Sequence, residues 1–149
     1  MRAVVQRVHR AAVSVGGRIV AKIESGLLVY VGVAANDESA DARYIAEKIR
    51  YLRIFADAHK PLNRDVIESG GSVLLVSAFT TQADARKGRR PALSEAAAPD
   101  NAERLYVCCR DHLADCGVRV ATGCFGEHMD VDSTNDGPIC VLIDSTKLF

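Results

Sequence analysis

The order of apolar and polar positions predicts that the chain opens in strands. Two apolar segments, residues 12–15 and 18–21, flank Gly16-Gly17, which is typical of a hairpin with a two-residue turn. Residues 26–34 are apolar without interruption, as expected for a strand that is covered on both faces.

Two later segments have the period of amphipathic helices. In residues 37–55 and again in residues 99–116, apolar side chains recur at helical spacing, and Gly117 is placed to cap the second helix. Further strands are predicted at residues 73–76, 118–121, near 129–131 and 139–143. The order of strands, helix, strand, helix and strands indicates a layered α/β fold rather than a doubly wound sheet. We expect one domain over residues 1–149.

Composition limits the classes of function. A formal net charge of zero argues against nucleic-acid binding through bulk charge, although a local basic patch remains compatible with it. No apolar run approaches the ~20 residues of a membrane helix, and the first residues do not resemble a secretory signal, so a cytoplasmic protein without a membrane partner is expected. The five cysteines are odd in number and include no C-x-x-C pair, so no disulfide is expected.

Three segments carry possible chemistry. Residues 77–81 (Ser-Ala-Phe-Thr-Thr) end a predicted strand, where free backbone N–H groups could stabilise an oxyanion, although such residues are more often turn formers. Residues 135–138 (Asn-Asp-Gly-Pro) predict a tight turn, and the sequence does not decide whether its proline is cis. A basic loop could meet phosphates or could equally be a solvated charge run. Its cations are Arg86, Lys87, Arg89 and Arg90.

These segments together resemble a known family. Residues 1–8, 52–55, 77–81, 83–91, 122–126 and 135–138 follow the order and spacing of the D-aminoacyl-tRNA deacylase family, from Met1 to about Ser145. The resemblance implies a layered β/β/α fold and a homodimer with active sites at the subunit interface. It also implies hydrolysis of D-aminoacyl-tRNA and glycyl-tRNA without a cofactor or metal.

The resemblance assigns a chirality filter to one dipeptide. Gly137-Pro138 is similar to the family's Gly-cisPro motif, which reaches into the pocket of the partner subunit and excludes the side chain of an L-amino acid by a clash. Arg7 matches the arginine that holds this loop. Without the resemblance, Arg7 would be interpreted as a surface cation on the first strand.

The resemblance also assigns the chemistry and the RNA contacts. Ser77, Phe79 and Thr80 match the catalytic segment, in which backbone N–H groups near Phe79 and Thr80 serve the oxyanion and the 2′-hydroxyl of the terminal ribose assists water. Phe125 and Met129 match residues that line the pocket for the terminal adenine, although both could be ordinary core residues. The basic loop is our candidate contact with the tRNA backbone.

The chain departs from the family at several positions. Ala78 and Thr81 replace the usual Gln and Leu of the first motif, and Ile139-Cys140 replaces the usual Val-Thr after Gly-Pro. A thiol is a weaker hydrogen-bond partner than a hydroxyl. We expect activity to survive these changes if catalysis rests on backbone groups and the ribose.

Three alternatives remain open. A metal hydrolase would use cysteines and histidines on and after the second helix, although their spacing fits no usual zinc pattern. These residues are Cys109, His112, Cys116, Cys124 and His128. A serine or threonine hydrolase would need a base from among His9, His59, His112 and His128. A non-catalytic module that binds the tRNA end would have lost its chemistry through Ala78 and Cys140.

Overall fold

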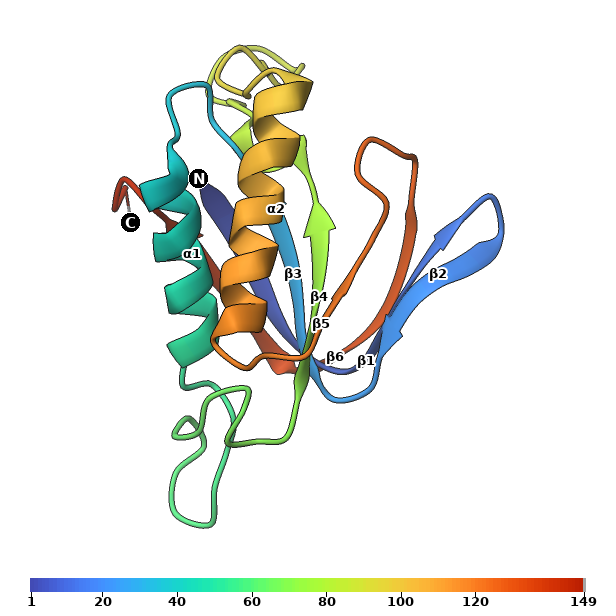
Figure 1. Ribbon diagram of the computed structural model, residues 1–149, viewed down its shortest axis with the longest axis vertical. Coiled ribbons are helices and arrows are strands. Elements are labelled where there is room, and N and C mark those ends of the chain that lie inside the picture. Colours follow the sequence, from blue (N-terminus) through green and yellow to red (C-terminus); the bar gives the residue numbers. More distant parts are fainter. Residues whose placement is uncertain (149) are drawn as a thin grey trace.

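A strongly curved sheet of six strands carries two helices on one face (Figure 1). This computed structural model describes residues 1–148. The strands are β1 (Arg2–Val15), β2 (Arg18–Ile23), β3 (Gly26–Gly32), β4 (Ser72–Ser77), β5 (Val120–Thr122) and β6 (Asp130–Asp144). Their order is β2-β1-β3-β4-β5, and β6 pairs with the other edge of β1.

The predicted hairpin is confirmed. Gly16 and Gly17 have φ values of 55° and 77°, and a two-residue turn with two positive φ values matches the twist of the flanking strands. β3 is buried along nearly its whole length, as its uninterrupted apolar run predicted. β3 and β4 run parallel, so their carboxyl ends lie at the same edge of the sheet.

The two helices are α1 (Ser39–Tyr51) and α2 (Pro99–Asp115), and they contact each other over the sheet (Figure 1). The prediction of a helix over residues 37–55 was too long. At the start, the Asp41 carboxylate accepts a hydrogen bond from the Glu38 N–H at 2.8 Å, which fixes the first turn. At the end, Leu52 is extended, and Phe55 exchanges backbone hydrogen bonds with Arg64 instead of continuing the helix.

The apolar side chains form two clusters, one on each face of the central strands. The first joins alternate residues of β1, β3 and β4 to the buried faces of both helices. The second lies between the other face of β3 and β4 and the curled halves of β1 and β2. Two sheet layers and one helix layer therefore enclose the core, and the expected β/β/α architecture is confirmed.

The prediction of two separate strands near residues 129–131 and 139–143 was wrong. Both belong to β6, because β1 is long enough to pair with both halves. Cys140 pairs with Gln6 and Asn135 pairs with Val8, so residues 136–139 leave the ladder opposite Arg7. The turn predicted at residues 135–138 is therefore a loop within one strand, and it does not reverse the chain. We call residues 136–139 the β6 loop, and its Gly137–Pro138 peptide bond is cis.

The ends of β1 and β6 are joined by a polar cluster. The Arg2 Nε–H donates to Asp144 Oδ2 at 2.7 Å, and Thr146 donates to Asp144 Oδ1 through its N–H at 2.7 Å and through its hydroxyl at 2.5 Å. Burial alone would raise the pKa of Asp144, but these hydrogen bonds and the Arg2 charge outweigh it and lower the pKa.

Residues 1–148 include no helix of the length and apolarity that a membrane span requires.

Replacement of Asp144 by Asn should therefore give a pH-dependent loss of stability. Because the folded pKa lies below the unfolded value of about 3.9, the stabilisation is present above about pH 4 and is lost as the pH falls through the folded pKa. We expect Asp144→Asn to lower the free energy of unfolding by about 1–3 kcal/mol at pH 7. Urea unfolding of both chains at pH 7, 5 and 3 tests this. A gap that stays constant down to pH 3 would contradict it.

Candidate functional site

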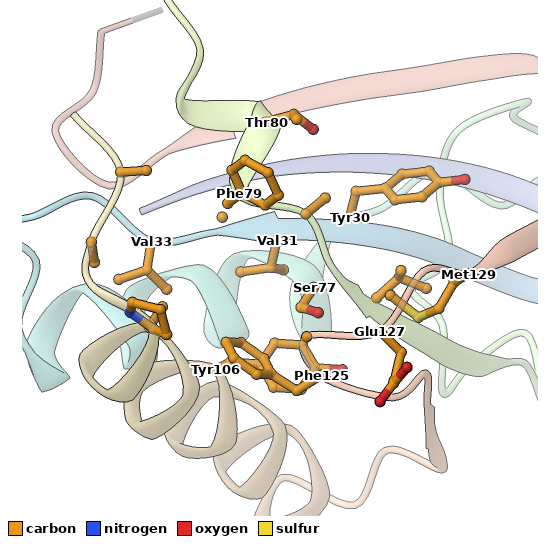
Figure 2. A pocket seen from close by; sticks show the side chains of 18 of the residues that line it. Tyr30, Val31, Val33, Ser77, Phe79, Thr80, Tyr106, Phe125, Glu127 and Met129 are labelled. Carbon is orange, nitrogen blue, oxygen red and sulfur yellow. The ribbon is translucent and has the colours of Figure 1, made fainter. Parts of the chain in front are cut away.

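A pocket of about 620 Å³ opens where the parallel strands β3 and β4 end (Figure 2). Tyr30–Val33 and Val76–Thr80 form one side of it. The start of α2 and the segment before β6 form the other side. Because Val31 pairs with Ser77, the ends of both strands reach the pocket at the same level.

The turn after β4 lines this pocket and contains two adjacent backbone N–H groups without a helix partner. It forms the short 3-10 helix η1 (Phe79–Gln82). The Ala78 N–H donates to the Val31 carbonyl at 2.8 Å, and the Thr81 N–H donates to the Ala78 carbonyl at 3.1 Å. The N–H groups of Phe79 and Thr80 lie between these two, at the first helical positions, where no carbonyl of the helix can be reached. Two adjacent donors at a pocket can stabilise an oxyanion.

Three residues that the sequence analysis did not single out hold this turn in place. The buried Gln82 side chain donates to the Gly32 carbonyl at 2.8 Å, and an Arg2 Nη donates to the Thr81 carbonyl at 3.3 Å. Gly32 lets the turn approach β3, because a Cβ there would lie 2.6 Å from the Ala78 carbonyl oxygen and 2.1 Å from Thr81 Oγ1. The turn is therefore fixed against both β1 and β3.

Aromatic side chains line the opposite wall (Figure 2). The rings of Tyr106 and Phe125 lie 5.9 Å apart with an interplanar angle of 47°. The Tyr106 hydroxyl donates to the Leu75 carbonyl at 2.7 Å, and burial raises the pKa of Tyr106, so the ring is neutral and fixed. Met129 lies near Gly123, where an added Cβ would be 2.6 Å from the Met129 sulfur. Such a wall suits a flat apolar or heterocyclic ligand.

The predicted site residues outside the basic loop fall into two groups in space. Ser77, Phe79, Thr80, Phe125 and Met129 all line the pocket, and Phe79 is 60% exposed at its rim. The second group lies elsewhere along β1 and β6 and does not line the pocket. It consists of Arg7, Gly137 and Pro138.

The distance of the second group from the pocket follows from the pairing of β1 with β3. Arg7 pairs with Leu27, five positions along β3 from Gly32 at the pocket, or about 17 Å of extended strand. Arg7 Nε lies 2.9 Å from Asp136 Oδ2, and an Arg7 Nη donates to the Ile54 carbonyl at 2.6 Å. Gly137 and Pro138 are both exposed. A single chain therefore does not bring this dipeptide to its own pocket.

The basic loop is exposed and leads back to the pocket. Reciprocal hydrogen bonds of 2.8 Å between the backbones of Asp84 and Ala92 close it, and Ala96 and Ala97 then line the pocket. Hydrogen bonds from Arg86 lower the pKa of Asp84 to about 2, so this cation is already paired. The other three cations, Lys87, Arg89 and Arg90, form no ion pair within residues 1–148.

The structure also places the residues of the alternative hydrolases. Across the described chain, residues 1–148, no three His, Cys, Asp or Glu side chains lie close enough to hold a metal ion. Cys109 lies on the buried face of α2, and burial raises the pKa of its thiol to about 12, which keeps it protonated. Of the four histidines, His128 lines the pocket, whereas His112 lies near Glu47 and His9 near Asp136.

Comparison with known proteins finds similarity over almost the whole chain. The family model described as D-Tyr-tRNA(Tyr) deacylase matches residues 4–144. A curated D-aminoacyl-tRNA deacylase of Desulforudis audaxviator is 53% identical over 149 residues, with 100% of each chain covered. One from Thermus aquaticus is 48% identical over 147 residues, covering 99% of this chain and 97% of the relative.

Two solved structures are similar over almost the whole chain. One, described as c-Myc DNA Unwinding Element Binding Protein, has a TM-score of 0.91 at 33% identity and covers 97% of this chain and 98% of its own. The other, from a structural analysis of a probable eukaryotic D-amino acid tRNA deacylase, has a TM-score of 0.80 at 17% identity. It covers 95% of this chain and 97% of its own, and it supports the fold alone.

Two glycine substitutions at the pocket should differ in cost. Gly32→Ala meets a backbone carbonyl that cannot move without η1, so we expect it to lower the free energy of unfolding by about 1–3 kcal/mol. Gly123→Ala meets only the end of the flexible Met129 side chain and should cost less than about 0.5 kcal/mol. Urea unfolding of the two variants compares them directly. Equal costs would show that η1 is not held as close to β3 as described.

Proposed function

The chain belongs to the D-Tyr-tRNA(Tyr) deacylase family and is an aminoacyl-tRNA hydrolase, and we propose that it cleaves the ester of D-aminoacyl-tRNA to free D-amino acid and tRNA. The match of residues 4–144 to the family, with 53% identity over the full chain to a curated relative, carries this proposal. The pocket at the ends of β3 and β4 is built from the same matched segments.

In the proposed reaction, water attacks the ester carbonyl and the ribose oxygen leaves with a proton. The negative charge that develops on the carbonyl oxygen is stabilised by the backbone N–H groups of Phe79 and Thr80. The 2′-hydroxyl of the terminal ribose assists the water. Thr80 then contributes its N–H rather than a nucleophilic hydroxyl, and Ser77 lines the same pocket (Figure 2).

We further propose that the chain acts as a homodimer in which each Gly137-Pro138 dipeptide reaches the pocket of the partner subunit. The separation of this dipeptide from its own pocket supports the proposal, as does its exposure. Leu142, on the same strand, is 56% exposed and offers apolar surface to a second copy. The carbonyl groups of the dipeptide would exclude an L side chain, whereas glycine, which has none, would pass, so glycyl-tRNA is a second proposed substrate.

The tRNA end would enter between the aromatic wall and the basic loop. The terminal adenine would pack against Phe125 and Met129, and Lys87, Arg89 and Arg90 would contact phosphates through salt-sensitive interactions. Such an enzyme would proofread aminoacyl-tRNA in the cytoplasm without a cofactor.

The second candidate function is a non-catalytic module that binds the tRNA end. The departure at Ala78 favours it, because Ala78 lines the pocket where the family has an amide. Cys140 does not line the pocket of its own chain, so its effect would depend on the partner subunit.

Three matched esters separate these functions. With purified protein, D-tyrosyl-tRNA and glycyl-tRNA should lose their amino acid rapidly, whereas L-tyrosyl-tRNA should be spared, and a chelator should change none of the rates. Release of labelled amino acid measures each rate. Binding of tRNA without hydrolysis of any ester would favour the module, and hydrolysis of the L ester as well would contradict the filter.

Two substitutions of Thr80 separate its N–H from its hydroxyl. Thr80→Ala keeps the backbone donor and should retain most of the activity on D-tyrosyl-tRNA. Thr80→Pro removes the donor while its fixed φ suits a 3-10 helix, so we expect kcat to fall by about 100-fold. Single-turnover hydrolysis measures both, with urea unfolding as the control for folding. An equal loss in the two variants would assign the role to the hydroxyl instead.

A further inference from the structure

The Gly137-Pro138 dipeptide of the β6 loop has no buried side chain to hold it in one conformation, although Ile139 at the end of the loop packs against the main apolar cluster. Gly137 has no side chain, and both Gly137 and Pro138 are exposed. Pro138 also lacks the N–H through which a strand residue is normally tied to its neighbour. A device that rejects a ligand by a clash must nevertheless be held to within about 0.5 Å. The side chains that flank the dipeptide therefore have to supply the constraint.

One constraint comes from β1. The Arg7 side chain is only 12% exposed, and its 2.6 Å hydrogen bond to the Ile54 carbonyl fixes its position. Ile54 is buried, and the neighbouring Phe55 is tied to Arg64 by backbone hydrogen bonds. Arg7 is thus a fixed cation that faces the loop from the only β1 position opposite it.

Asp136 is the residue of the loop that meets this cation. Its Oδ2 lies 2.9 Å from Arg7 Nε, and its Oδ1 lies 3.6 Å from Nε2 of the exposed His9. Removal of the carboxylate would leave a largely buried guanidinium with a carbonyl as its remaining partner. The loop would then lose its attachment to β1 one residue before Gly137.

Asn135 supplies a second, independent constraint. Its Oδ1 accepts a hydrogen bond from the Ile139 N–H at 3.0 Å and so closes the loop across the dipeptide. The closure is tight, because a Cβ on Gly137 would lie 2.7 Å from the Ile139 nitrogen, and Gly137 has a φ of 133°. The dipeptide is therefore held on one side by an ion pair and on the other by an amide bridge.

We propose that Asp136, through Arg7, and Asn135, through Ile139, are positioning residues that set how strictly the enzyme rejects L-aminoacyl esters. This inference rests on the proposed function. Neither residue touches the ester. Each acts on the placement of Gly137-Pro138. Its loss should therefore weaken the discrimination between D- and L-aminoacyl esters before it abolishes hydrolysis.

The test is the ratio of kcat/KM for D-tyrosyl-tRNA to that for L-tyrosyl-tRNA. Asp136→Asn keeps the shape of the side chain and removes its charge. We expect the ratio to fall about tenfold, chiefly because hydrolysis of the L ester rises; such a change corresponds to about 1.4 kcal/mol. Asp136→Glu, which keeps the charge, should restore part of the ratio.

Asp132→Asn is the matched control. It makes the same change on the same strand, at an exposed position that pairs with Ala12 and lies outside the β6 loop. We expect it to leave the ratio unchanged. Arg7→Met should lower the ratio as Asp136→Asn does, and the double variant should be no worse than either single one, because the two side chains act through one contact.

The outcomes separate the two proposals. A wild-type chain that hydrolyses neither ester, or both equally, overturns the proposed function. A discriminating wild type whose Asp136→Asn and Asn135→Ala variants keep the same ratio overturns the positioning role alone. Asp136→Asn could destabilise the fold so far that it cannot be assayed, which urea unfolding would show. Asn135→Ala then still tests the positioning role, because it leaves the ion pair of Arg7 and Asp136 in place.

Discussion

The pairing of β1 along both of its edges is the constraint on which the rest of the structure depends. One edge holds β3 and then β2, and the other holds β6 over almost its full length. β1 is 14 residues long and follows the strong curvature of the sheet (Figure 1), so its two halves lie in different layers. Residues near Ala3 and Val5 therefore face the helices, whereas Val13 packs inside the curled half of the sheet. Both the pocket and the β6 loop take their positions from this strand.

The pocket depends on a close approach that only the folded sheet provides. β3 and β4 end at the same edge because they are parallel, and η1 begins where β4 ends. Gly32 allows η1 to lie against β3, and Gln82 holds it there by a buried hydrogen bond. The N–H groups of Phe79 and Thr80 thus belong to a turn that is anchored on both sides. In the proposed reaction, donors that are fixed in this way would need no reorganisation when charge develops.

The sequence predicted local features well and long-range ones poorly. Gly16-Gly17 located the hairpin, because two adjacent glycines satisfy a requirement for positive φ that is purely local. The end of α1 was placed too late, because Phe55 pairs with Arg64 and that pairing leaves no trace in the helical period. β6 was divided in two, because only the length of its partner β1 shows that both halves form one strand.

The same distinction applies to the site. Ser77, Phe79, Thr80, Phe125 and Met129 were found by resemblance, and the structure gathers them around one pocket. Gly32, Gln82 and Arg2 were missed, since each acts through a contact with a residue at least 46 positions away in the chain. Such partners cannot be read from spacing, because nothing near them in the sequence requires a glycine, an amide or a cation.

The division of the site residues into two groups has a physical consequence. Arg7 is part of the β1–β6 ladder and holds the β6 loop beside it, and the pocket lies at the β3–β4 edge, so no hinge within the chain can bring the loop to the pocket without breaking strand pairing. If Gly137-Pro138 acts on a substrate in this kind of pocket, a second chain has to supply it. Fidelity then depends on how firmly each subunit holds its own loop. That is a property of contacts such as Arg7–Asp136, which lie away from the reacting atoms.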